Sequence, residues 1–134
     1  MAKVTKESMV VVILDSNIII CLSKEMIEVE DIFDNTEEYA VSVITYMEVL
    51  AYSFENSDEE SSIKNLLSFF KIPYIDEEIV KIVIELKKNY KIKLLDAIIC
   101  ATAIYNSATL ITNDIRLKNI KNLNLNLMQT SGIK

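Results

Sequence analysis

The chain has 134 residues, of which 51% are hydrophobic, and its formal net charge at pH 7 is −6. It contains no histidine, which excludes Ser-His-Asp and Cys-His nucleophile systems, HExxH zinc sites and imidazole general bases. Its one glycine, Gly132, cannot build a P-loop or a GxGxxG turn. Any catalytic chemistry in this chain must therefore depend largely on carboxylates.

The length and the hydrophobic content fit a single domain over residues 1–134. The longest apolar runs, such as residues 9–14 and 18–22, are far shorter than the roughly 20 residues of a membrane-spanning helix. No small-residue cleavage site follows a continuous apolar region near the N-terminus, so we predict no signal peptide. The expected location is cytoplasmic. Cys21 and Cys100 belong to no CxxC or Cys/His motif, which favours buried thiols over a disulfide or metal ligands.

Short runs of β-branched and other apolar residues predict the strands. The clearest candidates, in chain order, are "VVVIL" (10–14), "AVSVI" (40–44) and "TLIT" (109–112). Weaker candidates are "IPYI" (72–75), which contains a proline, and "LNLMQ" (125–129), which we expect at an edge of the sheet.

Two helices are marked by their first and last turns. Ser57 and Glu60 have capping-box spacing ahead of an apolar stripe with helical periodicity. Asp76 begins a second helix, whose last turns carry Lys87 and Lys88. Strands separated by helical crossovers predict a mainly parallel sheet covered on both faces, so the expected fold is a three-layer α/β/α domain. Ligands of such folds bind at the carboxyl ends of the strands.

Four acids occupy that end of the predicted sheet. Asp15 closes the first strand, Glu48 lies one turn into the helix after the second, Asp96 opens the apolar helix "LLDAIICATAI", and Asp114 follows the strand at 109–112. Each has a structural explanation, since Asp15 and Asp96 suit helix N-caps, Glu48 has capping-box spacing from Thr45, and Asp114 suits a turn. Caps alone do not explain why these four lie among apolar residues, whereas most other acids lie in polar stretches.

A group of carboxylates at one site requires compensation. Two like charges ~4 Å apart repel by about 4 kcal/mol at an effective dielectric constant of 20, so four stay ionised together only with cations between them. Oxygen ligands without histidine or cysteine favour a hard cation, Mg²⁺ or Mn²⁺. Such a site can activate a water and offset the charge that develops on a phosphate. The chemistry indicated is hydrolysis of phosphodiester bonds.

The segments "LDSNIII", "SVITYMEVL", "LLDAIICATAI" and "LITNDIRL" occur in the order and with the spacing of the PIN-domain nucleases. The chain resembles this family, and within it the VapC-like toxins of type II toxin–antitoxin systems. The resemblance extends from Val10 to about Leu127. Any one of the four segments is a weak signal, but the ordered set is fairly specific.

The resemblance implies a PIN-like α/β/α domain with Mg²⁺- or Mn²⁺-dependent endoribonuclease activity. It also implies a metal-activated water as the nucleophile, a cognate antitoxin as protein partner, and a homodimer. The residues that match the family pattern are Asp15, Glu48, Asp96 and Asp114 as catalytic metal ligands, with Asn17 and Thr112 as polar support for them.

Two positions depart from the pattern of the family. Leu95 stands where many relatives have proline before the aspartate, and Arg116-Leu117 stands where an Asp-Phe pair often follows the last acid. The second departure changes the charge beside the site. It either favours contact with phosphate or marks the loss of an accessory acid and weaker binding of a second metal.

Charge is distributed unevenly along the chain. Residues 1–86 carry 6 basic side chains against 18 acidic ones, whereas residues 87–134 carry 8 basic against 2 acidic. The basic groups flank the proposed metal site in sequence, and Lys91, Lys93, Arg116 and Lys118 are the candidates for contact with RNA phosphates. Ordinary solvated lysines explain the same pattern. The expected substrate is single-stranded RNA, such as a loop, because duplex RNA offers little to read.

Two other functions remain open from the sequence. One is a PIN nuclease of RNA processing or decay that has no antitoxin. The other is a catalytically inactive binding module, in which the acids are caps and divalent metal has no effect.

Overall fold

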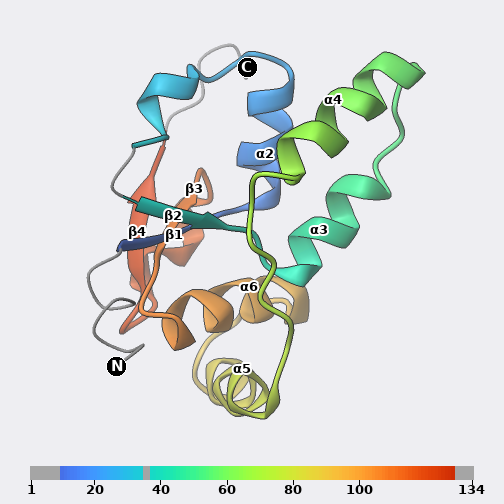
Figure 1. The fold of residues 1–134 in the computed structure, drawn as a ribbon. Helices are drawn as coiled ribbons and strands as arrows, with labels where there is room; N and C mark the ends of the chain where they lie inside the picture. Colours follow the sequence, from blue (N-terminus) through green and yellow to red (C-terminus); the bar gives the residue numbers. More distant parts are fainter. Residues whose placement is uncertain (1–9, 35–36, 129–134) are drawn as a thin grey trace, which may run out of the picture.

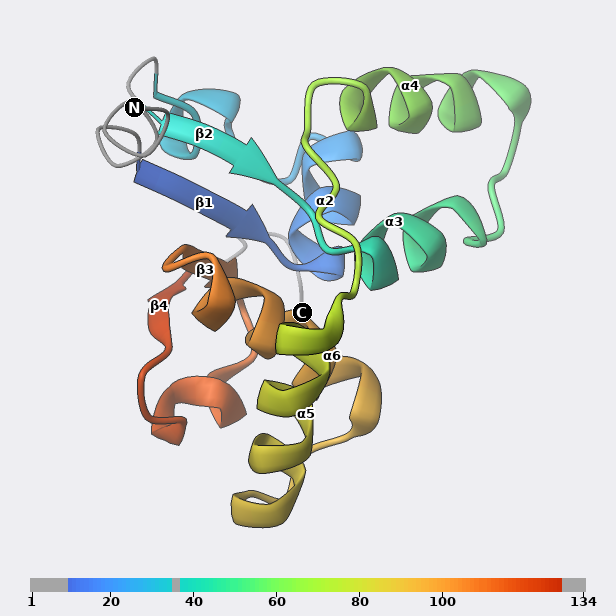
Figure 2. The ribbon, with the colours of Figure 1, turned by 60° about the horizontal axis from the view of Figure 1, so that its bottom comes forward.

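The computed structural model describes residues 10–34 and 37–128. Within these ranges it contains one sheet of four strands, β1 (Val10–Leu14), β2 (Glu37–Ala40), β3 (Thr109–Thr112) and β4 (Asn124–Leu127). All neighbouring strands are parallel, and their order is β2-β1-β3-β4. In Figure 2 the arrows of β1 and β2 point the same way, towards the helices that carry part of the site. The parallel sheet expected from the sequence is therefore confirmed.

Helices connect these strands and cover both faces of the sheet (Figure 1). The described α-helices are α2 (Ser16–Ser23), α3 (Val43–Leu50), α4 (Ser57–Leu67), α5 (Glu77–Asn89) and α6 (Leu94–Tyr105), and two short 3-10 helices are η1 (Val29–Asp31) and η2 (Ile115–Asn119). No described helix combines the length and apolar character needed to cross a bilayer.

The core is divided by the sheet into two clusters. Ile13 and Leu110 face one side, which α6 covers with α5 packed against it, and both side chains are fully buried. Val12, Leu14 and Ile111 face the other side, against α2, α3 and α4. Since side chains alternate along a strand, apolar residues on both faces require cover on both sides. The three-layer α/β/α prediction is confirmed.

The pairing of β1 with β3 determines where the site forms. Leu14 pairs with Ile111 at the end of the ladder. One residue further on, the backbone N–H of Asp15 donates to the carbonyl of Ile111 (2.9 Å). The first acid is thus fixed beside the carboxyl end of β3, although the two strands lie far apart in sequence.

The prediction of a strand at residues 40–44 was wrong for all of these residues except Ala40. β2 ends at Ala40, and α3 begins at Val43 because the fully buried Ser42 is its N-cap. The Ser42 hydroxyl accepts the N–H of Thr45 (3.1 Å). A short β-branched run does not distinguish a strand from a buried helix start. The capping residue of α3 is therefore Ser42 rather than Thr45, and this cap sets the position of Glu48.

The strand predicted at residues 72–75 and the predicted start of α4 differ from the structure, whereas the predicted start of α5 is confirmed. Residues 72–75 form no strand, and only Lys71 makes a single parallel bridge, to Ala40. The cap of α4 is Asn56, one residue before the predicted Ser57, and Asn56 Oδ1 accepts the N–H of Glu59 (2.8 Å). Asp76 caps α5 as predicted, accepting the N–H of Ile79 (3.0 Å).

Two further predictions can be compared with the structure. The strand predicted at 125–129 is β4, one residue earlier at its start, and residue 129 lies outside the described residues. Cys21 and Cys100 are buried and are not joined in a disulfide, as the sequence indicates.

Replacement of Ser42 by alanine tests the cap of α3. Ser42→Ala should lower the free energy of unfolding by about 1 kcal/mol, because the N–H of Thr45 loses its acceptor in a buried position. Ser62→Ala, at an exposed position within α4, is the matched control and should change stability by less than about 0.5 kcal/mol. Urea titrations followed by circular dichroism give both values, and equal stability of the two variants would contradict the cap.

Candidate functional site

The four acids predicted from the sequence come from four different elements. Asp15 follows β1 and is the N-cap of α2, Glu48 lies in α3, Asp96 lies in the first turn of α6, and Asp114 follows β3 and caps η2. All four belong to the carboxyl-end side of the sheet, where the strands give way to helices.

Asp15 is both a cap and part of the site. Its Oδ1 accepts the N–H of Ser16 (2.8 Å), and its Oδ2 accepts a hydrogen bond from the hydroxyl of Thr112 (2.7 Å). Thr112 is fully buried at the end of β3. Thr112 therefore contacts Asp15 directly and joins the ends of β1 and β3, and its role as support for a metal ligand stays a prediction.

Glu48 is held by a residue that the sequence did not single out. The hydroxyl of Ser16 donates to Glu48 Oε1 (2.6 Å) and lies 3.1 Å from the Oγ1 of Thr45, which is fully buried. Ser16 thus links the helix after β1 to α3. A hydroxyl next to Asp15 was visible in the sequence, but only the packing of α2 against α3 shows which acid it contacts.

Asp114 is engaged by Arg116 through two side-chain hydrogen bonds. Arg116 Nε donates to Asp114 Oδ1 (2.9 Å), and Nη2 donates to Oδ2 (2.7 Å). The backbone N–H of Arg116 also donates to Oδ1 (3.0 Å). The side-chain bonds are the main reason why the pKa of Asp114 is below its usual value, with a smaller contribution from the charge of Lys93.

Asp96 differs from the other three acids. It is not the cap of α6, since Lys93 holds that position without a side-chain hydrogen bond. Within the described part of the chain, the Asp96 carboxylate accepts no hydrogen bond. Partial burial raises its pKa first, and the negative charges of Asp15, Asp114 and Glu48 raise it further, while Arg116 opposes them. The four acids therefore share one electrostatic environment, with Asp96 as the acid that has no hydrogen-bond partner.

Cys100 lies one turn further along α6 and is fully buried. Burial, and then the charges of Asp15, Asp96 and Asp114, raise its pKa to about 12. Cys100 therefore stays a neutral thiol at physiological pH.

Two of the acids line a cleft of about 600 Å³ together with basic side chains. Asp96 and Asp114 lie in it with Lys91, Lys93 and Arg116, three of the four residues predicted to contact RNA. Lys87 also lines the cleft, donating to the carbonyl of Ile92 (2.6 Å), whereas Lys118 does not. Asn17 is exposed and makes no hydrogen bond to the acids in the described residues.

Carboxylate and hydroxyl oxygens are ligands that Mg²⁺ and Mn²⁺ prefer, so the chemistry of this donor set fits a hard divalent cation. As they stand, no three acidic or thiol side chains of residues 10–34 and 37–128 are close enough to hold one metal ion. Glu48 is turned to Ser16 and Asp114 to Arg116. Metal binding thus requires these acidic side chains to move closer together, and at Asp114 the cation would compete with Arg116 for the carboxylate.

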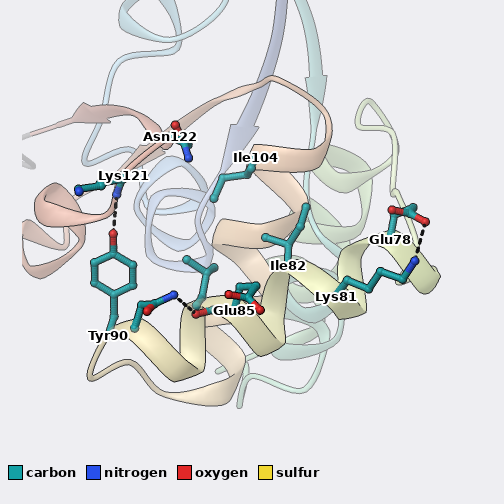
Figure 3. A pocket seen from close by; sticks show the side chains of 10 residues that line it. Glu78, Lys81, Ile82, Glu85, Tyr90, Ile104, Lys121 and Asn122 are labelled. Atoms are coloured by element: carbon teal, nitrogen blue, oxygen red, sulfur yellow. Dashed lines mark hydrogen bonds and ion pairs between the residues drawn. The ribbon is translucent and has the colours of Figure 1, made fainter.

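A second cleft, of about 750 Å³, lies between α5 and the loop after η2 (Figure 3). Its apolar wall contains Ile82 and Ile104, and the hydroxyl of Tyr90 accepts the backbone N–H of Lys121 across it (3.0 Å). None of the four acids lines this cleft, so the candidate chemistry belongs to the smaller one.

Solved structures with similar folds are known. A chain of VapBC2 from Rickettsia felis, solved with a DNA fragment, has a TM-score of 0.77 and 23% identity, covering 89% of this chain and 99% of that one. A toxin–antitoxin complex from Klebsiella pneumoniae gives a TM-score of 0.68 and 30% identity over 84% and 94% of the two chains. VapBC-1 from nontypeable Haemophilus influenzae gives 0.71 and 25% over 87% and 97%.

Among curated protein sequences, none matches this chain. The family model for the PIN domain matches residues 12–123, a range that contains all four acids. That range is most of the chain, and the topology agrees with the solved relatives. The chain therefore belongs to the PIN domain family of nucleases.

Proposed function

We propose that this protein is a Mg²⁺- or Mn²⁺-dependent endoribonuclease and the toxin of a toxin–antitoxin pair. The observation that carries the proposal is Asp96, a half-buried acid that caps no helix and is destabilised by the charges of three other acids. Neither a cap nor a described hydrogen bond gives this carboxylate a structural role. A cation that neutralises the group supplies the reason.

In this proposal Asp15, Glu48, Asp96 and Asp114 are the catalytic residues and hold the metal. A divalent cation held by these residues would supply a water of lowered pKa and would compensate the negative charge that develops on the phosphate. Thr112 keeps Asp15 oriented through its 2.7 Å hydrogen bond, which is the usual task of groups around metal ligands. Asn17, whose side chain is exposed in the first turn of α2, is proposed as a further polar support.

The substrate we propose is single-stranded RNA. Lys91, Lys93 and Arg116 line the cleft beside Asp96 and Asp114, where they can contact phosphates on either side of the cleaved bond, and Lys118 extends this basic surface along η2. Contacts with phosphates position a strand without reading its sequence. The identity of the target RNA would then depend on its shape and accessibility.

The toxin assignment is supported by the relatives. The structure from Klebsiella pneumoniae is described as a toxin–antitoxin complex, and that from Haemophilus influenzae as VapBC-1. We propose a cognate antitoxin for this chain by the same relationship, and a homodimer on the resemblance to VapC-like toxins. The alternative within the family is a PIN nuclease of RNA processing or decay without an antitoxin, and the alternative outside enzymes is an inactive binding module.

Divalent metal should stabilise the folded protein. A ligand that binds only the folded state adds about 2.7 kcal/mol when its concentration is 100 times its Kd, so millimolar Mn²⁺ should raise the Tm. Differential scanning fluorimetry with Mn²⁺, Mg²⁺ and EDTA measures this change. Asp58→Asn, an exposed acid in the first turn of α4, should keep the full shift, whereas Asp96→Asn should lose most of it. An unchanged Tm in Mn²⁺ would contradict the metal site.

Asp96→Asn should abolish cleavage while leaving the fold intact. Since no described hydrogen bond depends on the carboxylate and its charge is unfavourable, the variant should melt at or above the wild-type temperature in EDTA. The measurement is sequencing of new RNA 5′ ends after incubation of total RNA with Mg²⁺ or Mn²⁺. Discrete metal-dependent cuts with 5′-phosphates are expected from the wild type and from Asp58→Asn. Cuts that persist with Asp96→Asn would refute the assignment.

Toxicity separates the two nuclease alternatives. Induced expression of the wild-type chain should arrest bacterial growth, and Asp96→Asn should not. The proposed antitoxin would be sought as a short reading frame beside the gene. Its co-expression should restore growth, and its product should co-purify with the chain. A nuclease that cuts RNA in vitro but neither arrests growth nor retains such a partner would favour RNA processing.

A further inference from the structure

We infer that Arg116 competes with the metal for Asp114. In the free protein its guanidinium binds the Asp114 carboxylate, and when the metal binds, the guanidinium binds an RNA phosphate instead. The inference rests on the proposed function and deepens it. It assigns Arg116 as a positioning residue that couples loading of the metal to binding of the substrate.

The first observation is that Arg116 occupies both oxygens of one proposed metal ligand. The contacts of 2.9 and 2.7 Å are a bidentate arrangement, in which the planar guanidinium matches the carboxylate. A divalent cation that uses Asp114 competes with these bonds for the lone pairs of the carboxylate oxygens. Asp15 and Glu48 differ, because their partners are neutral hydroxyl and backbone groups that can remain beside a metal ligand.

The second observation is that the Arg116 side chain can be released at low cost. Its relative exposure is 71%, against 21% for Asp114. An ion pair with one exposed partner is weak, because water solvates the charge when the pair separates. Arg116 therefore blocks Asp114 in the free protein without preventing metal binding.

The third observation is the position of Arg116 in the cleft. It lies there with Lys91 and Lys93, and its charge also acts on Asp96. A guanidinium that leaves Asp114 remains in the cleft beside these lysines. There a bound phosphate offers the same bidentate geometry as a carboxylate. Metal bound to the acids and phosphate bound to Arg116 would then stabilise each other.

The test compares Arg116→Gln with Lys88→Gln, which removes the same charge from an exposed residue of α5 that lines neither cleft. Isothermal titration calorimetry of the full-length proteins with Mn²⁺ alone should show about two- to fivefold tighter binding by Arg116→Gln, the range expected for loss of an exposed ion pair. Lys88→Gln should bind like the wild type. Arg116→Lys, which keeps the charge but not the bidentate contact, should lie between the wild type and Arg116→Gln.

The phosphate half of the inference is measured with a fluorescein-labelled twelve-nucleotide oligothymidylate, whose integrity is checked on a gel afterwards. In Mn²⁺, Arg116→Gln should bind it several-fold more weakly than the wild type, with a salt dependence smaller by about 0.7 in the slope of log K against log salt. In EDTA, where Arg116 stays on Asp114, the two proteins should bind it almost equally.

The outcomes are distinguishable. Equal Mn²⁺ affinity of the wild type and Arg116→Gln, or an Arg116→Gln defect in oligothymidylate binding that is as large in EDTA as in Mn²⁺, overturns the role of Arg116 and leaves the nuclease proposal intact. Failure of every variant to bind Mn²⁺ overturns the metal centre itself and this inference with it. Circular dichroism and the Tm in EDTA verify that each variant is folded.

Discussion

The parallel pairing of β1 with β3 is the constraint on which the site depends. It places Leu14 opposite Ile111, and the next residue of each strand leads directly into the site. The hydrogen bond from Thr112 to Asp15 closes this junction between residues 97 positions apart in sequence. α3, which carries Glu48, packs against α2, α4 and α6, and α6 carries Asp96, so helix packing brings these two acids to the same end of the sheet.

The four acids illustrate different ways to keep negative charge in a folded protein. Asp15 and Glu48 accept hydrogen bonds from neutral donors, and Asp114 has a guanidinium of its own. Asp96 has no such partner in the described residues, and both burial and its neighbours disfavour its charge. Three of the acids thus have local hydrogen-bond partners that stabilise their charge, whereas the charge of Asp96 has none in the described part of the chain and is opposed by its neighbours. That imbalance distinguishes a candidate catalytic group from a cap better than its sequence context does.

The layers of this fold could be predicted from the sequence because the spacing of apolar residues shows which faces of each strand and helix are buried. The strands at 10–14 and 109–112 and the cap at Asp76 are local signals, and the structure confirms them. Residues 40–44 were misread because the buried hydroxyl of Ser42 starts a helix within a β-branched run. The contact of Ser16 with Glu48 could not be predicted, since it depends on how α2 and α3 pack.

The separation of Asp15 from Thr112 also affects when the candidate site can form during synthesis. β1 and Asp15 are made early, but Thr112 of β3 follows Asp15 by 97 residues. When two strands far apart in sequence pair, the chain loses the entropy of loop closure before the stabilising contacts between the strands form. A chain synthesised only as far as α3 therefore contains Asp15 and Glu48 without α6 and β3, so the candidate site cannot assemble until β3 has been made.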